Sequence, residues 1–133
     1  MKHFIIPVLL VVFSFSAFAQ SKKTNVEVLY FKAQLACCQA KSCNKIEGDV
    51  KDMIDKMYPN ANVKYKVVQM ESEANKALVQ KYKARAMSLV IVNTSKKKET
   101  FVDASDIIRQ YYRSGDKAKL EKDLKEKINL AAR

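Results

Sequence analysis

Short apolar runs typical of β-strands alternate with apolar stripes at helical spacing along this 133-residue chain, and their order limits the folds that it can adopt. The strand-like runs are residues 26–31, 63–70 and 87–92, the last being the most apolar segment after residue 19. We expect a turn at 93–98 and a hairpin partner at 99–102. Strand, helix and strand in succession predict a parallel pair joined by a crossover, and the late hairpin adds an antiparallel strand.

The first helix is expected to begin at Ser42 and to end before Pro59. Residues 32–42 are then a loop that carries Cys37 and Cys38. Apolar residues at i, i+4, i+7, i+8 and i+11 form one stripe along this helix, and the stripe predicts the face that packs on the sheet. These residues are Ile46, Val50, Met53, Ile54 and Met57.

Three later segments also carry helical patterns. Residues 72–82 predict a helix capped by Ser72. Its expected inward residues are Ala74, Ala77, Leu78 and Tyr82. A third helix begins at Ser105 or Asp106 and is interrupted at 114–116, before a last helix at 117–131. The apolar positions of these two helices are Ile107, Ile108, Tyr111, Tyr112, Leu120, Leu124, Ile128 and Ala131. The predicted class is therefore α/β, in the order β-α-β-α-β-β-α, with a mixed four-stranded sheet and a split final helix.

The first 19 residues have the order of a cleaved secretory signal. A short basic start precedes a mostly apolar run at 4–18, and Ala17-Phe18-Ala19 forms a small-x-small site before Gln20. The apolar run is shorter than the roughly 20 residues of a transmembrane helix. We therefore predict a signal peptide at 1–19, one domain at 20–133, a periplasmic or secreted location, and no membrane association after cleavage.

The chain is strongly basic, with 25 Lys and Arg against 14 Asp and Glu, a net charge of +11. Removal of Lys2 with the signal leaves +10. Lysines occur in every segment and cluster only at 96–98, within a predicted turn. We expect a solvated basic surface and no nucleic-acid partner, with docking onto an acidic partner protein as the alternative.

Three cysteines, Cys37, Cys38 and Cys43, lie within seven residues. An exported chain meets an oxidising compartment, and three thiols cannot all pair within one chain. A disulfide across so short a loop gives little cross-link entropy. This placement favours chemistry over architecture.

The element order, with cysteines at the first strand-to-helix junction, resembles thioredoxin. Residues 82–92 are similar to the thioredoxin segment that enters the third strand through a cis-proline, and Ser88 stands at the proline position. The stretches 30–31, 43–47 and 88–90 resemble the ArsF family, thioredoxin-like proteins linked to nitrophenyl-compound nitroreduction as subunits. That family usually carries C-x-x-C ending at the position of Cys43, whereas residue 40 here is Ala. The resemblance implies a thiol subunit of nitroreduction that supplies electrons or handles a metal. The chain carries no flavin motif, so we do not expect it to be the flavin catalyst itself.

The arrangement C-C-x4-C resembles the site of the ArsD-type arsenite metallochaperones. It implies As(III) or Sb(III) held by Cys37, Cys38 and Cys43. Three thiolates suit a trigonal soft ion. Cu(I) is another soft ion that thiolates select. Structural zinc is disfavoured, because it takes four ligands and the chain has no His after His3.

The residues leave three readings of these thiols open. In the first, Cys38 is the nucleophile and Cys43 the resolving thiol of dithiol–disulfide exchange with a redox partner protein or thiol substrate, with Cys37 and Ser88 beside them. A helix N-terminus together with Lys41 and Lys45 predicts a lowered pKa for Cys43 and its partner. In the second, all three thiolates bind a soft metal or metalloid ion. In the third, a Cys38–Cys43 disulfide is purely structural and the domain is non-catalytic.

Overall fold

The structure, a computed structural model, describes residues 25–34, 37–60, 62–95 and 98–133, without the side chains of residues 37–39. The predicted signal peptide at 1–19 and its cleavage site lie outside the described residues. None of the described helices is both long and apolar enough to cross a membrane.

The described strands form one mixed sheet of four strands in the order β2-β1-β3-β4. They are β1 (Val26–Lys32), β2 (Val63–Gln69), β3 (Leu89–Asn93) and β4 (Thr100–Asp103). β1 pairs with β2 in parallel, and the β1–β3 and β3–β4 pairs are antiparallel. The structure thus confirms the crossover, the hairpin and the central place of the third strand that the sequence predicts.

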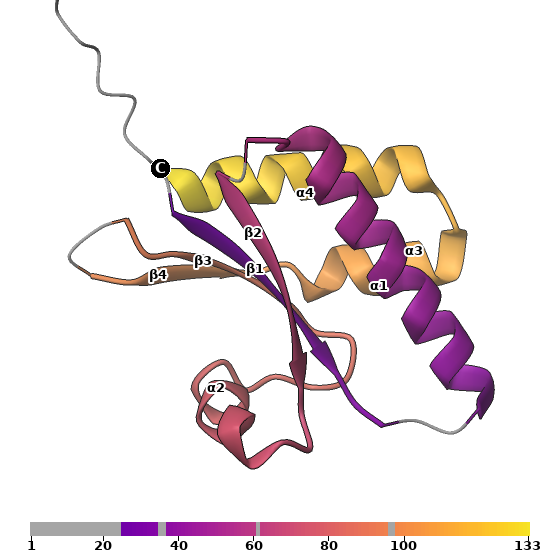
Figure 1. The fold of residues 1–133 in the computed structure, drawn as a ribbon. Helices are drawn as coiled ribbons and strands as arrows, with labels where there is room; N and C mark the ends of the chain where they lie inside the picture. The colour runs from indigo at the N-terminus through magenta and orange to yellow at the C-terminus, as the bar shows by residue number, and fades with distance from the viewer. Residues whose placement is uncertain (1–24, 35–36, 61, 96–97) are drawn as a thin grey trace, which may run out of the picture.

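Helices cover both faces of this sheet and complete three layers (Figure 1). α1 (Cys37–Met57), α3 (Ser105–Ser114) and α4 (Lys117–Ala132) lie on one face, and the short α2 (Lys76–Lys81) lies on the other. The order and the sheet topology are those of a thioredoxin-like fold, as expected. The last helix is split where predicted, because Gly115 adopts a left-handed φ of 67° and ends α3.

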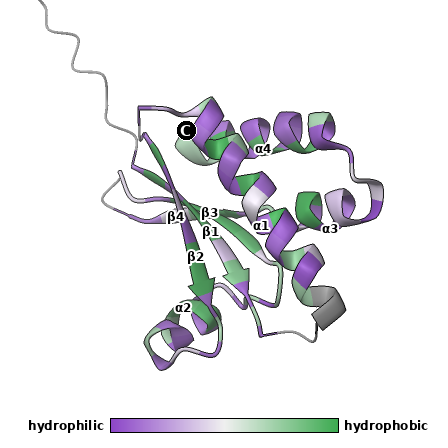
Figure 2. Ribbon diagram, turned by 45° about the vertical axis from the view of Figure 1, so that its right-hand side comes forward, coloured by the Kyte–Doolittle hydropathy of each residue, from purple (hydrophilic) through white to green (hydrophobic). Residues whose placement is uncertain are grey.

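The apolar residues of the central strands alternate between two cores. Val28 and Tyr30 face α1, α3 and α4, whereas Leu29 and Phe31 face the side of α2. Because both faces of β1 are covered, its sequence is apolar at nearly every position. All five residues of β3 are buried for the same reason. Figure 2 shows apolar residues concentrated in the central strands, and helices in which apolar and polar residues alternate.

The helix predicted at 72–82 is shorter than expected. A 3-10 turn (Glu73–Asn75) precedes α2, and the Ser72 side chain makes no capping hydrogen bond. Ala74 and Ala77 are exposed, which makes their predicted inward placement wrong. The small methyl groups of alanine bury little area, and the larger Leu78, together with Val79 and Tyr82, packs on the sheet instead.

The start of α3 also differs in detail from the prediction. The residue before its first turn is Ala104, not Ser105 or Asp106. The Ser105 hydroxyl accepts a hydrogen bond from the Leu89 amide at 3.1 Å and donates one to Asp103 Oδ1 at 2.6 Å. It therefore joins α3 to β3 rather than capping its own helix. Tyr111 is buried, as predicted, and Tyr112 is 54% exposed at the rim.

One partly buried carboxylate, 13% exposed, links the three helices of the larger core. Asp49 on α1 accepts hydrogen bonds from Tyr111 Oη on α3 at 2.7 Å and from Lys45 Nζ at 2.8 Å. Lys117 Nζ on α4 lies 2.7 Å from its other oxygen. Burial raises the pKa of Asp49, but the hydrogen bonds from Lys117, Lys45 and Tyr111 outweigh it and hold that pKa far below its usual range.

Candidate functional site

The first helix begins at Cys37, five residues before the predicted start at Ser42. The expectation that Cys37 and Cys38 lie in a loop is therefore wrong. Residues 37–41 contain neither Gly nor Pro, and Gln39, Ala40 and Lys41 are good helix formers. Nothing in this segment opposes extension of the helix toward β1.

This early start determines the spacing of the three cysteines along α1. In a regular helix the Cα atoms of residues i and i+5, here Cys38 and Cys43, lie about 8.6 Å apart. Disulfides usually join Cα atoms about 4.4–6.8 Å apart. The Cα atoms of Cys37 and Cys43 lie farther apart still. A disulfide between Cys43 and either of the others therefore requires the first turn of α1 to unwind. The side chains of Cys37 and Cys38, on which each reading depends, lie outside the described residues.

Cys43 lies in the second turn of α1 and faces the core. Its side chain is only 5% exposed, and it is a free cysteine. The Tyr30 hydroxyl donates a hydrogen bond to its carbonyl oxygen at 3.4 Å. Burial raises the pKa of the Cys43 thiol, opposed by the positive charge of Lys32. The predicted lowering of its pKa is wrong, because the helix dipole acts within the first turn and Cys43 lies beyond it.

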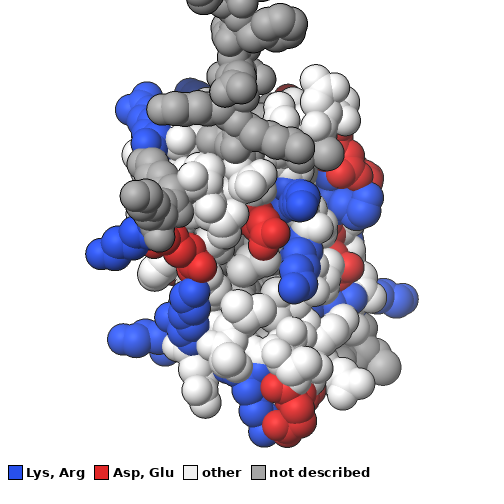
Figure 3. All heavy atoms as spheres, turned by 60° about the vertical axis from the view of Figure 1, so that its left-hand side comes forward, with Lys and Arg blue, Asp and Glu red and all other residues white. Residues whose placement is uncertain are grey.

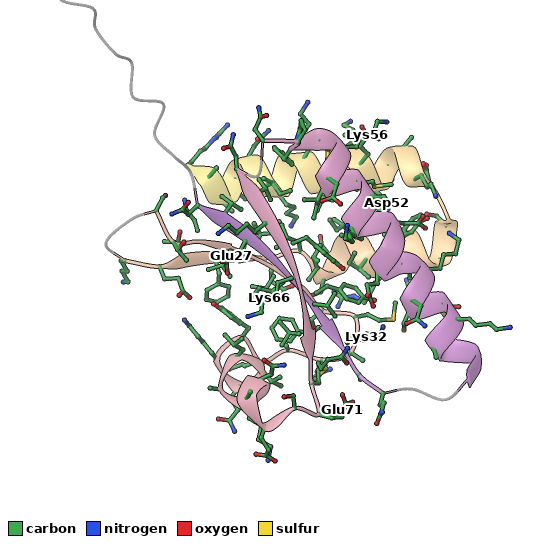
Figure 4. The ribbon with its side chains drawn as sticks, in the orientation of Figure 1. Glu27, Lys32, Asp52, Lys56, Lys66 and Glu71 are labelled. Atoms are coloured by element: carbon green, nitrogen blue, oxygen red, sulfur yellow. The ribbon has the colours of Figure 1, made fainter. Side chains whose placement is uncertain are left out.

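A half-buried ion pair lies beside Cys43, between β1 and α1. Lys32 Nζ is 2.7 Å from Glu47 Oε2, and the two side chains are 26% and 25% exposed. Figure 4 places Lys32 at the carboxyl end of β1. Glu47 Oε2 is buried, and among the described residues no donor makes a hydrogen bond of good geometry to it. Its close partner is the positive charge of the Lys32 ammonium. Glu47 follows Cys43 by four residues and shares its helix face.

Neither Lys32 nor Glu47 was predicted from the sequence as part of a site. The spacing of Cys43 and Glu47 was a usable signal for one of them, because residues four apart are neighbours on a helix. Lys32 had no comparable signal, since only the packing of α1 on β1 brings it close. It takes the role that was predicted for Lys41 and Lys45, a positive charge near a cysteine.

The two predicted lysines have other places in the structure. Lys41 is exposed on α1. Lys45 bonds Asp49 and Tyr111, and its ammonium lies 5.6 Å from the centre of the Tyr111 ring. Its charge is therefore directed at α3, and the described contacts do not connect it with Cys43.

Ser88 ends a tight turn before β3. Its amide donates to the Arg85 carbonyl at 3.0 Å, and its hydroxyl accepts from the Arg85 amide at 2.9 Å. The Ser88 carbonyl accepts from the Phe31 amide, and the Met87 amide donates to the Phe31 carbonyl, both at 2.9 Å. These bonds attach the turn to the carboxyl end of β1, the strand that leads to the cysteines.

The described residues form an α/β domain with the sheet topology of a thioredoxin-like fold and a buried thiol in the second turn of its first helix. No family model matches the chain. No curated protein is significantly similar to it. A solved structure described as a malarial protein aligns with 67% of this chain and 96% of its own, at 20% identity and a TM-score of 0.39.

Proposed function

We propose that this protein is an exported thiol protein that carries out dithiol–disulfide exchange, as a redox or electron-transfer accessory to a partner protein. The observation that carries the proposal is the buried Cys43 beside the Lys32–Glu47 pair. A resolving thiol has to stay protonated until a mixed disulfide has formed. Burial raises the pKa of Cys43 and so favours its protonated form. Glu47, four residues after Cys43 on the same helix face, is the acceptor that we assign to its proton.

The nucleophile in this proposal is Cys38, the second residue of α1, with Cys37 adjacent. Unpaired amides and the positive end of the dipole favour a thiolate in the first turn of a helix. The Cys38 thiolate attacks a substrate disulfide, the S–S bond breaks, and one substrate sulfur leaves as a thiolate. Cys43 then loses its proton and attacks the Cys38 sulfur, which releases the second substrate thiolate. A dithiol partner returns the resulting Cys38–Cys43 disulfide to two thiols.

The second step requires the first turn of α1 to open, because a regular helix holds the two Cα atoms about 8.6 Å apart. We therefore expect fast formation of the mixed disulfide and slow resolution. Glu47→Gln is expected to slow resolution alone and to change its pH profile. Asp55→Asn is the matched control, since Asp55 lies on the same helix and is 59% exposed.

The test uses the reduced protein and a small-molecule disulfide, with intact mass and free thiols followed over time. Cys43→Ala is expected to trap the mixed disulfide, and Cys38→Ser to prevent it. If Cys38→Ser leaves the reaction unchanged, the nucleophile is misassigned. If the protein does not react and instead binds arsenite one to one through all three cysteines, the exchange proposal fails and the soft-ion reading takes its place.

A further inference from the structure

A second candidate site lies between the turn at 85–88 and α3. A cavity of about 630 Å³ opens there. Its basic lining residues are Lys83, Arg85, Arg109 and Arg113. The acidic residue of the lining is Asp103, whose Oδ1 accepts hydrogen bonds from the Ser105 amide at 2.8 Å and hydroxyl at 2.6 Å. Four cations thus surround one cavity together with a single carboxylate.

These four cations have no carboxylate partner among the described residues, unlike many lysines of the molecule. Among the described residues, none of their side chains makes an ion pair or a hydrogen bond, whereas Lys45, Lys51 and Lys119 each have a carboxylate partner. Arg109 and Arg113 are four residues apart on α3, a spacing at which like charges repel each other. All four side chains are exposed, so an anion in the cavity can reach them.

The backbone around the cavity is held in an unusual conformation as well. Lys83 has φ 48° and Met87 has φ 65°, in the left-handed region that favours glycine. Lys83 follows α2, where the amides of Lys83 and Ala84 bond the carbonyls of Gln80 and Val79 at 3.2 and 2.9 Å. Glycine is the usual residue at this position of such a helix end. A lysine there places a fourth cation on the cavity wall at a conformational cost.

We infer that this cavity binds a small polyanion, a compound with two or more carboxylate or phosphate groups. Guanidinium groups bind both kinds of oxyanion through paired hydrogen bonds. The Tyr112 ring, 54% exposed in the lining, supplies an apolar contact for the carbon skeleton of the ligand. The volume falls within the range of about 300–1,000 Å³ that is typical of small-molecule sites.

The grouping of the four cations around one cavity favours a small ligand over an extended polymer. On the face shown in Figure 3, basic side chains are interleaved with acidic ones and separated by uncharged surface. A nucleic acid needs a continuous basic track along its backbone. The four cations that line the cavity instead share one concave site.

Titration calorimetry with citrate and with pyrophosphate tests this inference. Arg109→Gln and Arg113→Gln are each expected to weaken binding about 10-fold or more, as for a lost hydrogen bond to a charged group. Lys56→Gln is the matched loss of one charge, because Lys56 is exposed near the carboxyl end of α1 (Figure 4), and it should leave binding unchanged. Binding of citrate alone identifies carboxylates as the preferred groups, and binding of pyrophosphate alone identifies phosphates.

Cys38→Ser is expected to bind the same probe as the unsubstituted protein, which separates this site from the thiol chemistry. Three results would overturn the inference. One is no binding of either probe at millimolar concentration, and another is equal weakening by Lys56→Gln and the arginine variants. The third is much tighter binding of a glutamate-rich peptide through the same arginines, which would assign the cavity to an acidic partner protein.

Discussion

Replacement of Asp49 by alanine offers a quantitative test of how α1 is held against α3 and α4. The Asp49 side chain is 13% exposed, and Tyr111, which donates to it at 2.7 Å, is 4% exposed. A buried hydrogen bond to a charged group contributes about 1.5–3 kcal/mol. The Lys45 and Lys117 partners are well exposed, so their pairs with Asp49 add little. We therefore expect Asp49→Ala to lower the free energy of unfolding by about 1.5–3 kcal/mol.

Asp55→Ala is the matched control for this measurement. Asp55 lies on the same helix, is 59% exposed and has one lysine partner, Lys51, at 2.6 Å. Both substitutions give the same gain in helix propensity, so their difference isolates the buried network. Urea unfolding followed by circular dichroism suits a chain without tryptophan. The reasoning is refuted if Asp49→Ala loses no more stability than Asp55→Ala.

The same variant predicts a pH dependence with a definite sign. The pKa of Asp49 in the folded protein lies below the unfolded value of about 3.9, so the unfolded chain binds the proton more readily. Its contribution to stability is therefore fully present above about pH 5 and is lost as the pH falls through the folded pKa. The stability gap between the unsubstituted protein and Asp49→Ala should narrow on acidification below about pH 4. A gap that stays constant there would contradict the assigned role of the charge.

Three further substitutions have expected outcomes that follow from backbone and core geometry. Gly115→Ala should lower the free energy of unfolding in urea by about 1 kcal/mol, because an alanine is strained at φ 67°. The added Cβ would meet open space, so steric contact adds nothing to this cost. No loss of stability would mean that the turn relaxes freely. Lys83→Gly should raise stability by about 0.5–1 kcal/mol and weaken citrate or pyrophosphate binding; a loss of stability would refute the strain at φ 48°. Leu124→Ala, at a fully buried position, should lower the free energy of unfolding by about 3 kcal/mol. Leu130→Ala, at a 54% exposed position of the same helix, should lower it much less. Equal losses would contradict the core assignment.

The apolar pattern was a sound guide to the fold because it is a local property. The stripe from Ile46 to Met57 predicted the face of α1 that packs on the sheet, and the apolar run of β3 predicted a central strand. The pattern failed where the local signal was weak. No glycine or proline marks the true start of α1 at Cys37, and Ala74 and Ala77 bury too little area to hold a full helix on the sheet.

By itself the sequence determined the α/β class, the order of strands and helices along the chain, and the place of the cysteines near the first strand-to-helix junction, because burial of apolar faces follows from their period along the chain. Only the tertiary structure decided the surroundings of the charged and reactive groups. Lys32 pairs with Glu47, and Lys83 lines the same cavity as Arg109 and Arg113. These residues are far apart in the sequence or separated by a helix boundary that the pattern misplaced. Electrostatic neighbours depend on distances in space, and packing sets those distances.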